Sequence, residues 1–466
     1  MKENNFRYIT KKDYKNFITC KFFWQLEQEV EDINFFNDSN KTTFAKKKYH
    51  SLLDEYEVSD EVNDTYMKEG LEFDILVKQL FSQKYETLNL NDEKYKDLSL
   101  SQKAKLTREA IDQKNVQYII NGWFIFNDLI CNPDLIEVID KSEIVLIEIK
   151  GRKKVDNSRD ISDLAFQYYL ITKLKIKIEN VKVVLLSDNF FYTRLNNYNE
   201  IYKFVHLVSI NRKIYSLLDA VFEQSLNISN VLIKIRQMAY PVLKEPLPRK
   251  IHNKCYINGE YCKYFKFCAK HINNIDIGEN SLLNLYNLKF DKKIKILNDG
   301  FYHFQDYPTF KDLLIELGVQ KKVNRINTIR ELQYLATVED RDIVDHFLIN
   351  EELKRYKGPI YMLDFETFAV IIPKILFTGS YQQVPFLYSI HIINDFDCLK
   401  EENKQILKKK IVHKTHIEDP NNFQLLNFLS HLSQDLRSHG DGTIVAYHAS
   451  FEISVIKNLI MSCEKI

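Results

Sequence analysis

Hydrophobic and polar positions follow a helical period near the start of the chain and a strand-like alternation from residue 116 onward. Thr10 and Asp13 have the spacing of a capping box, and the apolar residues after them predict a helix at about 11–29. A second helical pattern covers about 68–83. Runs of β-branched and aromatic residues then predict four strands, with a helix at 161–174 between the last two. The strands are expected at 117–126, 128–139, 143–151 and 181–188.

The later pattern predicts a second unit of strands and helices beyond a helical stretch. A strand at about 203–209 and helices at about 213–240 close the first series, before a run of prolines. Residues 273–356 carry mainly helical signals and are interpreted as a connector. New strands are predicted at 359–367, 385–393 and 443–450, the last leading into a helix. We therefore expect an α/β protein divided at about 1–272, 273–357 and 358–466.

Composition and charge narrow the class of protein. The 466 residues include 65 Lys and Arg against 64 Asp and Glu, so any contact with nucleic acid must come from local basic patches. Only 11 Gly and 9 Pro are present, which excludes collagen-like, Gly/Ser-linker and Pro-rich proteins. No apolar run approaches a membrane helix, and the first residues lack the apolar stretch of a signal peptide. We expect a cytoplasmic protein without a membrane partner, and the sequence leaves its oligomeric state open.

The first candidate site combines two carboxylates and a lysine. Asp134 lies on one predicted strand, and Glu148 and Lys150 end the next. Strand alternation places Glu148 and Lys150 on one face, with Ile149 pointing away. Two carboxylates on adjacent strands suit a hard cation such as Mg²⁺, and a neighbouring lysine could position an attacking water. The tripeptide alone also fits an ordinary solvated strand end.

Asp134, the sequence IEIK and a following helix with Gln167 and Tyr168 together resemble the PD-(D/E)XK nucleases, most closely their RecB-like branch. The resemblance covers about 10–270 and implies a restriction-endonuclease-like core. It implies Mg²⁺ or Mn²⁺ on Asp134 and Glu148, a catalytic Lys150, and a DNA-facing or site-supporting Gln167 and Tyr168. Two positions depart from the branch. Asp74 stands where an upstream helix often carries His, which makes it a further metal-ligand candidate, and Ile171 replaces a usual Tyr.

Three cysteines crowd into one short segment, at Cys255, Cys262 and Cys268. Their spacing is too open for a finger-type zinc site, and thiolates suit either zinc or an iron–sulfur cluster. An early Cys20 with three late cysteines resembles the iron–sulfur staple of RecB-like nucleases, which implies a 4Fe–4S cluster on these four residues. The alternatives are free buried thiols, or Zn²⁺ with a histidine ligand. The histidines considered are His252 and His271, and the remaining cysteines are interpreted as core residues at Cys131, Cys398 and Cys463.

A second pair of acids, Asp364 and Glu366, is expected on one face of a buried strand, where a cation would offset their mutual repulsion. With Glu452 in a later ASFE sequence, the pair resembles the first two signatures of DnaQ-like (DEDD) exonucleases, on an RNase H-like fold. His448 and Glu452 depart from the usual Asn and Asp. The third signature is not found before Ile466, so we expect an incomplete domain whose missing segment would cover an apolar surface. An uncharacterised bacterial domain family joins the same two halves in this order.

These observations lead to one functional hypothesis and one alternative. The chain is expected to be a metal-dependent nuclease acting on phosphodiester bonds, with DNA favoured over RNA as substrate. The alternative is a nucleic-acid-binding or scaffold module on the same folds without turnover, and the second pair of acids is equally compatible with an inactive remnant. His413 and His416 have ligand-like spacing but are interpreted as solvated residues on a charged loop.

Overall fold

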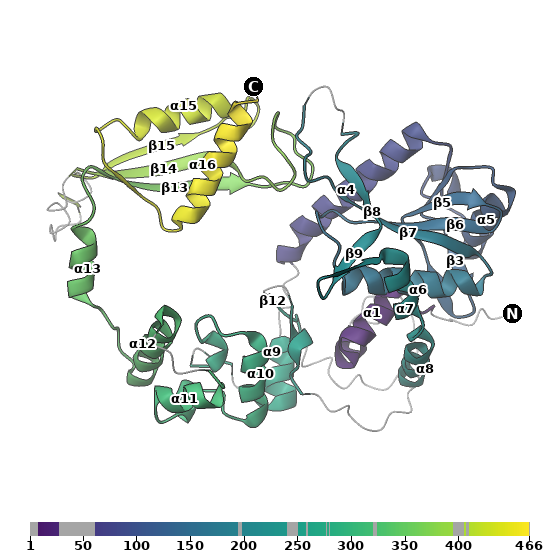
Figure 1. Ribbon diagram of the computed structural model, residues 1–466, viewed down its shortest axis with the longest axis horizontal. Coiled ribbons are helices and arrows are strands. Elements are labelled where there is room, and N and C mark those ends of the chain that lie inside the picture. The colour runs from purple at the N-terminus through teal and green to yellow at the C-terminus, as the bar shows by residue number, and fades with distance from the viewer. Residues whose placement is uncertain are drawn as a thin grey trace, which may run out of the picture.

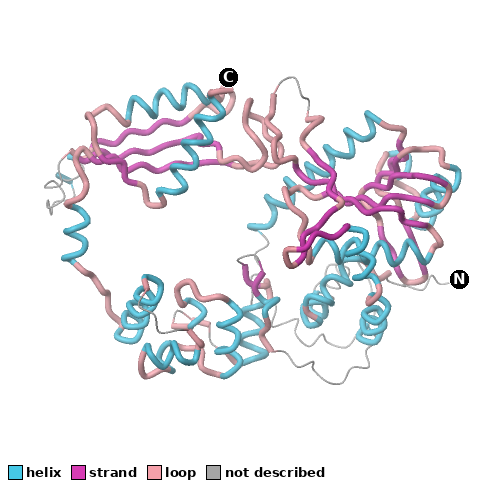
Figure 2. The backbone as a smooth tube through the Cα atoms, viewed as in Figure 1, coloured by secondary structure: helices cyan, strands magenta, loops and turns pink. Residues whose placement is uncertain are grey.

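A computed structural model of the chain describes residues 8–27, 61–193, 198–239, 250–257, 260–275, 277–278, 280–319, 324–394, 405–406 and 410–465. Four residues considered above lie outside these ranges: Pro241, Pro246, Pro248 and Cys398. Two strand-containing regions are separated by a mainly helical one (Figure 2). No helix in the described ranges is long and apolar enough to cross a membrane.

The first region is a mixed sheet covered by helices on both faces (Figure 1). The strands run in the order β1-β2-β5-β6-β7-β8, with β6 parallel to β7 and antiparallel to β5. The helices are α1 (Lys11–Thr19), α4 (Glu61–Lys84), α5 (Leu100–Gln113), α6 (Arg159–Lys173), α7 (Leu217–Ser225) and α8 (Ile228–Ala239). The strands of the sheet are β1 (Thr87–Asn89), β2 (Tyr118–Ile120), β5 (Leu135–Asp140), β6 (Glu143–Ile149), β7 (Lys177–Leu186) and β8 (Tyr202–Val205). Two hairpins accompany it, β3 (Phe124–Phe126) with β4 (Leu129–Cys131), and β9 (Leu207–Ile210) with β10 (Lys213–Ser216).

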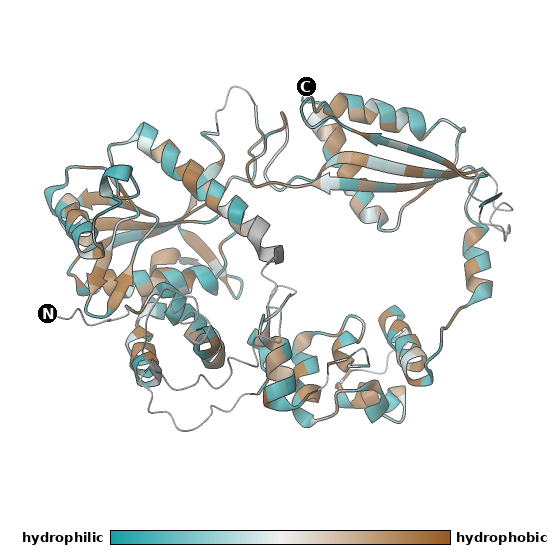
Figure 3. Cartoon of the chain, turned by 180° about the vertical axis from the view of Figure 1, so that it is seen from behind, coloured by the Kyte–Doolittle hydropathy of each residue, from teal (hydrophilic) through white to brown (hydrophobic). Residues whose placement is uncertain are grey.

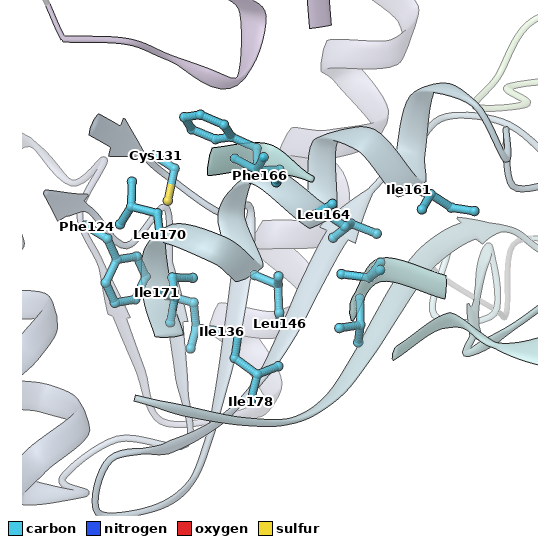
Figure 4. Packing of buried hydrophobic residues seen from close by; sticks show 14 of the residues in the cluster. Phe124, Cys131, Ile136, Leu146, Ile161, Leu164, Phe166, Leu170, Ile171 and Ile178 are labelled. Carbon is cyan, nitrogen blue, oxygen red and sulfur yellow. The ribbon is translucent and has the colours of Figure 1, made fainter. Parts of the chain in front are cut away.

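Alternation along β6 divides its side chains between the two faces. Ile144 and Leu146 pack in the core under α6, which Figure 4 shows around Leu164 and Leu170. Val145, Ile147 and Ile149 face the core under α4. The strands are correspondingly hydrophobic in Figure 3. A strand buried on both faces needs apolar residues at consecutive positions, which explains the unbroken apolar run.

Three predicted elements of this region are each divided in two. The predicted strand 117–126 breaks at Asn121, whose φ is 52°, and Gly122, where a Cβ would lie 2.5 Å from Ile136 Cδ1. The predicted strand 128–139 breaks between β4 and β5, so Asp134 lies in a bend rather than in a strand. The predicted helix 11–29 ends at Thr19, because Cys20 has extended backbone angles, and helix resumes over 21–27.

The middle region continues the packing of the cysteine segment. Residues Ile251 and Phe265 share one buried cluster with Phe290 and Leu297, so the expected boundary at 272 falls inside a core. The segment contains η2 (Asn253–Cys255), β11 (Tyr256–Ile257), β12 (Glu260–Tyr261), α9 (Phe265–Phe267) and η3 (Cys268–Ile272). The connector is mainly helical as predicted, with α10 (Phe290–Asp299), α11 (Phe310–Glu316), α12 (Arg325–Glu339) and α13 (His346–Leu353).

The second α/β region is a four-stranded sheet in the order β15-β14-β13-β16, with β13 antiparallel to β14 and parallel to β16. Helices α15 and α16 pack on the side of β13 that carries Leu363 and Phe365. The elements are β13 (Ile360–Phe368), β14 (Val384–Ile393), β15 (Val412–Ile417), α15 (Leu425–Asp435), β16 (Thr443–Val445) and α16 (Ala449–Cys463). The prediction missed β15, and its histidines therefore lie on a strand rather than on a loop.

The segment between β13 and β14 reaches back to the first region (Figure 1). Ile371 is buried in the core under α4, and the Tyr381 hydroxyl donates to the Gly151 carbonyl at 2.6 Å. A Cβ at Gly151 would lie 3.1 Å from Ile371 Cδ1 and 3.3 Å from Gly70 Cα, so a glycine suits this approach of three segments. The two α/β regions therefore touch next to Lys150.

Candidate active site and cysteine cavity

The first predicted site forms a compact group of charged side chains at the end of β6. Glu148 is fully buried, and its Oε1 accepts from Lys150 Nζ at 2.8 Å. Its Oε2 accepts from Gln167 Nε2 of α6 at 3.0 Å. Asp134 Oδ2 accepts from the Ile149 N–H at 2.8 Å, which ties the bend before β5 to the end of β6. The structure therefore brings together all four residues that the sequence nominated for catalysis.

Asp74 joins this group through a lysine. Lys78, one turn along α4, lies 2.7 Å from Asp74 Oδ2 and 3.8 Å from Asp134 Oδ1. The other oxygen, Asp74 Oδ1, is buried without a hydrogen-bond partner among the described residues, as is Gln167 Oε1. Buried oxygens without partners carry a desolvation cost, so these two atoms are available to a further ligand.

Lys11 is a member of the site that sequence reasoning missed. Its Nζ lies 2.8 Å from Glu148 Oε1, although the two residues are 137 positions apart. Four residues later on α1, Lys15 Nζ donates to Asp163 Oδ2 of α6 at 3.0 Å. Nothing in the sequence around Lys11 distinguishes it from other lysines, because the contact depends on how α1 packs against α6. Sequence reasoning also missed Lys78. Its local signal is its position four residues after Asp74 on a predicted helix, a spacing at which side chains can pair.

Opposing electrostatic effects separate the pKa values of the two carboxyl groups in this group. Burial raises the pKa of Glu148, but the Lys11 and Lys150 ammonium groups and the Gln167 amide outweigh it and hold the pKa below its ordinary value. Burial and the negative charge of Glu148 raise the pKa of Asp134 to about 6. Burial lowers the pKa of Lys150, but the two carboxylates outweigh it and raise the pKa. The site thus keeps Glu148 ionised and Lys150 protonated at neutral pH.

A cleft of about 610 Å³ adjoins this group on the α4 side. Asp74 and Lys78 form part of its wall. Uncharged hydrogen-bonding side chains contribute most of the remainder, at Gln79, Ser82, Gln83, Thr87, Asn89 and Asn91. Amides and hydroxyls at these positions can contact phosphate and sugar oxygens without adding net charge.

The four nominated cysteines line one cavity of about 490 Å³. Cys20 follows the last residue of α1, whereas Cys255, Cys262 and Cys268 come from the segment after residue 250. The Cys262 N–H donates to the Cys255 carbonyl at 2.8 Å, which folds that segment back on itself. All four are reduced cysteines, and burial raises the pKa of Cys262 to about 11. The cysteines converge despite the distance between them in the sequence.

The two histidines considered as zinc ligands differ in position. His252 lies in the wall of the cavity, and its Nδ1 accepts from the Lys254 N–H at 3.2 Å. His271 is exposed and contacts the Phe267 ring instead. Of the other cysteines, Cys131 is buried in the core shown in Figure 4, and Cys463, the last residue of α16, packs partly buried against the core of the second α/β region.

Both sets of side chains have donors suited to the groups expected there. Within the described ranges no three His, Cys, Asp or Glu side chains are grouped closely enough to hold a metal ion. In the first site, ammonium groups contact the carboxylates, and the oxygen donors match the preference of Mg²⁺ and Mn²⁺. In the cavity, four thiols suit an iron–sulfur cluster or zinc.

The acids of the second region have different surroundings from those expected. Asp364 and Glu366 share one face of β13, as predicted, but that face is exposed rather than buried. Glu452 is buried on α16, and its Oε2 has no hydrogen-bond partner among the described residues. No hydrogen bond or ion pair joins these three acids in the residues that the structure describes. The expectation of a buried acid pair is therefore wrong, because α15 and α16 cover the opposite face of this sheet.

The histidines of β15 also differ from expectation, because both make contacts in the sheet. His413 stacks on His391 with ring centroids 4.3 Å apart, and its Nε2 lies 2.9 Å from Ser389 Oγ. His416 Nε2 lies 2.8 Å from Glu418 Oε1. A strand therefore replaces the loop that the sequence suggested, while His413 is exposed, as the interpretation of a solvated residue expected.

In comparison with known proteins, one family model matches part of the chain. The model of a family described as a domain of unknown function (DUF2779) matches residues 361–466, from the second residue of β13 through α16. Neither the curated proteins nor the solved structures returned a match. The match concerns the second α/β region and carries no statement about activity.

Proposed function

We propose that this chain is a metal-dependent nuclease that hydrolyses phosphodiester bonds, with DNA as the favoured substrate. The observation that carries the proposal is the contact of Glu148 with both Lys150 and Gln167. Asp134, in the bend before β5, accepts from the Ile149 N–H at the end of β6 and lies beside this contact. Perturbed acids and a lysine next to a cleft that carries a few polar side chains are typical of catalytic sites.

Asp134 and Glu148, with Asp74 beside them, are the residues that would hold Mg²⁺ or Mn²⁺. A bound divalent ion would polarise the phosphate and lower the pKa of water. The chain's own contribution is to orient these oxygens. The Ile149 N–H fixes Asp134 and the Gln167 amide fixes Glu148, so neither carboxylate needs to reorganise when substrate arrives.

Lys150 is proposed to position the attacking water and to offset charge that develops on the phosphate. Its ammonium lies at the carboxylate group, and its raised pKa keeps it charged at neutral pH. The cleft beside Asp74 and Lys78 would receive the phosphate and sugar groups of the substrate. Substrate contacts there would come from uncharged donors, in agreement with the near-zero net charge.

The proposal also includes a specific fold for each of the two α/β regions. A restriction-endonuclease-like core is supported by the order of β5, β6, α6 and β7 around the site. An RNase H-like (DnaQ-like) second region is supported by a sheet in which β13 pairs antiparallel with β14 and parallel with β16. The exposed acids of β13 favour the inactive form of that second region.

The cysteine cavity is proposed to hold a structural 4Fe–4S cluster, with Zn²⁺ as the alternative. Four thiols from two ends of the first region line it, so ligation would join Cys20 to the later segment and add to folding stability. A reducing cytoplasm would preserve such thiols. Metal analysis and a visible spectrum of anaerobically purified protein separate the two groups.

The nuclease proposal is tested by cleavage of single- and double-stranded DNA and RNA with Mg²⁺ or Mn²⁺. Wild type is compared with Lys150→Ala and with Glu143→Gln, a carboxylate change at the other end of β6. Cleavage by wild type and Glu143→Gln, but not by Lys150→Ala, supports the proposal. Equal inactivity of all three proteins, with retained nucleic-acid binding, would leave the binding module as the function.

A further inference from the structure

Helix α1 connects the carboxylate group to the cysteine cavity. Lys11, its first residue, contacts Glu148, and Cys20, just beyond its last residue, lines the cavity. Nine helical residues span about 14 Å. Lys15 takes part in both places, because its ammonium binds Asp163 and its side chain also forms part of the cavity wall.

The helix is held as a rigid element between these two ends. Thr10 and Asp13 form a reciprocal capping box, and Trp24 Nε1 donates to Asp13 Oδ1 at 3.2 Å. Tyr14 and Phe17 are buried, and the Tyr14 ring lies 5.8 Å from that of Phe166. Phe166 precedes Gln167 on α6, so α1 packs directly on the helix that supports Glu148. A displacement at one end is therefore transmitted to the other.

The segment that carries the late cysteines also contacts the C-terminal end of α1 directly. Lys254, next to Cys255, donates its ammonium to the Ile18 carbonyl at 2.7 Å. A cation at this position satisfies a carbonyl that has no partner within the helix and interacts favourably with the helix dipole. The segment with the late cysteines is thus connected to α1 in two ways. It shares the cavity with Cys20, and Lys254 donates to the end of the helix.

We propose that α1 couples the cysteine cavity to the carboxylate group, with Lys11 and Lys15 as positioning residues for Glu148 and Asp163. This inference rests on the proposed function, since it assigns the regulation of the same cation site. When the cavity holds Cys20 in place, Lys11 is kept at Glu148 and restrains cation entry. When the cavity loosens, Lys11 withdraws and a divalent cation meets less competing positive charge.

The test measures Mn²⁺ binding by electron paramagnetic resonance of the free ion, independently of turnover. Lys11→Met removes the charge and keeps the stem, and it is expected to tighten Mn²⁺ binding about tenfold, equivalent to 1.4 kcal/mol. Lys11→Arg retains the charge and should stay near wild type. Lys12→Met is the matched control, because Lys12 is exposed on the same helix and its ammonium lies 3.8 Å from Glu27.

A double-mutant cycle then tests the coupling. Cys20→Ser should tighten Mn²⁺ binding about threefold in the wild-type background and leave it nearly unchanged with Lys11→Met, since contacting groups are non-additive. Lys254→Met, an exposed change that preserves the core, is expected to act in the same way. It keeps the test decisive if Cys20→Ser fails to fold.

The outcomes separate this inference from the nuclease proposal. If Glu148→Gln abolishes Mn²⁺ binding but the cycle is additive, the coupling is wrong and the cation site stands. Unchanged Mn²⁺ affinity in Lys11→Met also overturns the coupling. If Glu148→Gln leaves Mn²⁺ binding intact, the proposed cation site is wrong and the coupling falls with it.

Discussion

Acidic residues on the strands of the two α/β regions differ in burial and in the contacts of their side chains. In the first, Glu148 is fully buried and contacts two ammonium groups and an amide. In the second, the side chains of Asp364 and Glu366 project from an exposed face of β13, and no side-chain hydrogen bond to them is found among the described residues. The difference follows from helix placement, because β6 is covered on both faces and β13 on one.

Burial changes what an acidic residue costs and what it can do. A buried charge needs partners to offset lost hydration, and the first region supplies them as Lys11, Lys78 and Lys150. An exposed acid stays hydrated and needs no such arrangement. Groups of buried, mutually dependent charges are common at functional sites, so the comparison supports the proposal that places the chemistry in the first region.

The sharpest test of this comparison is to neutralise each group of acids. Glu148→Gln removes a charge without changing volume, and cleavage should fall by more than about a hundredfold, the upper limit for loss of an outer-shell partner. The double variant Asp364→Asn, Glu366→Gln should cleave within about threefold of wild type, because surface changes away from a site are nearly neutral. Single-turnover cleavage rates measure both. A large loss in the double variant would reverse the assignment.

Gln167 is expected to produce the next largest effect. Gln167→Met keeps the length of a fully buried side chain but removes the amide that donates to Glu148 Oε2. Loss of such an orienting partner typically costs about 10- to 100-fold in activity. The same rate assay measures it, with circular dichroism as the check on folding. Activity equal to wild type would show that Lys11 and Lys150 orient Glu148 without help.

Local pattern predicted much of this fold and part of the site. The strand at 143–151 and the helix at 161–174 are confirmed as β6 and α6, since long apolar periods survive most tertiary contexts. The alternation argument for Glu148, Lys150 and Ile149 also holds, because the period of a strand is fixed by its backbone.

What the sequence could not supply depends on contacts between distant segments. Lys11 reaches Glu148 only because α1 docks on α6, and no local pattern encodes that distance. Asp364 was expected to be buried because its neighbours are apolar, yet those neighbours face the helices and leave Asp364 outward. Breaks at Asn121 and Cys20 likewise reflect backbone conformations that apolar periodicity does not report.

Stability at different pH values provides a smaller test of the same contrast. The pKa of Asp134 is about 6 in the folded protein against an ordinary 3.8, so folding favours its protonated form. That stabilisation is fully present below about pH 4 and is lost as the pH rises through 6. At pH 7 Asp134→Asn should therefore raise the free energy of unfolding, on the order of 2 kcal/mol.

The advantage of Asp134→Asn should shrink when the pH is lowered from 7 to 5. Asp364→Asn, at an exposed position, should change stability by less than about 0.5 kcal/mol at either pH. Urea unfolding followed by tryptophan fluorescence reports on the first region, because both tryptophans, Trp24 and Trp123, lie there, and circular dichroism follows the second region together with the first. A destabilised Asp134→Asn at pH 7 would mean that the contact with Lys78 outweighs burial.

The smallest expected effect concerns the point where the two regions meet. Tyr381→Phe removes the hydrogen bond to the Gly151 carbonyl but keeps the ring. Loss of one such bond should weaken docking of the segment between β13 and β14 by about 1 kcal/mol. When opening is fast, proteolysis follows the population of the open form, so chymotrypsin should cleave this segment about fivefold faster.

Phe is also a chymotrypsin site, and Tyr447→Phe at a fully exposed position is the matched control. An unchanged cleavage rate would mean that Ile371 and the strand-like contact of Phe191 with Gly379 hold the segment without this bond. The second region, which carries the exposed acids, would then stay attached to the first region without a hydrogen bond to Gly151, the residue next to Lys150.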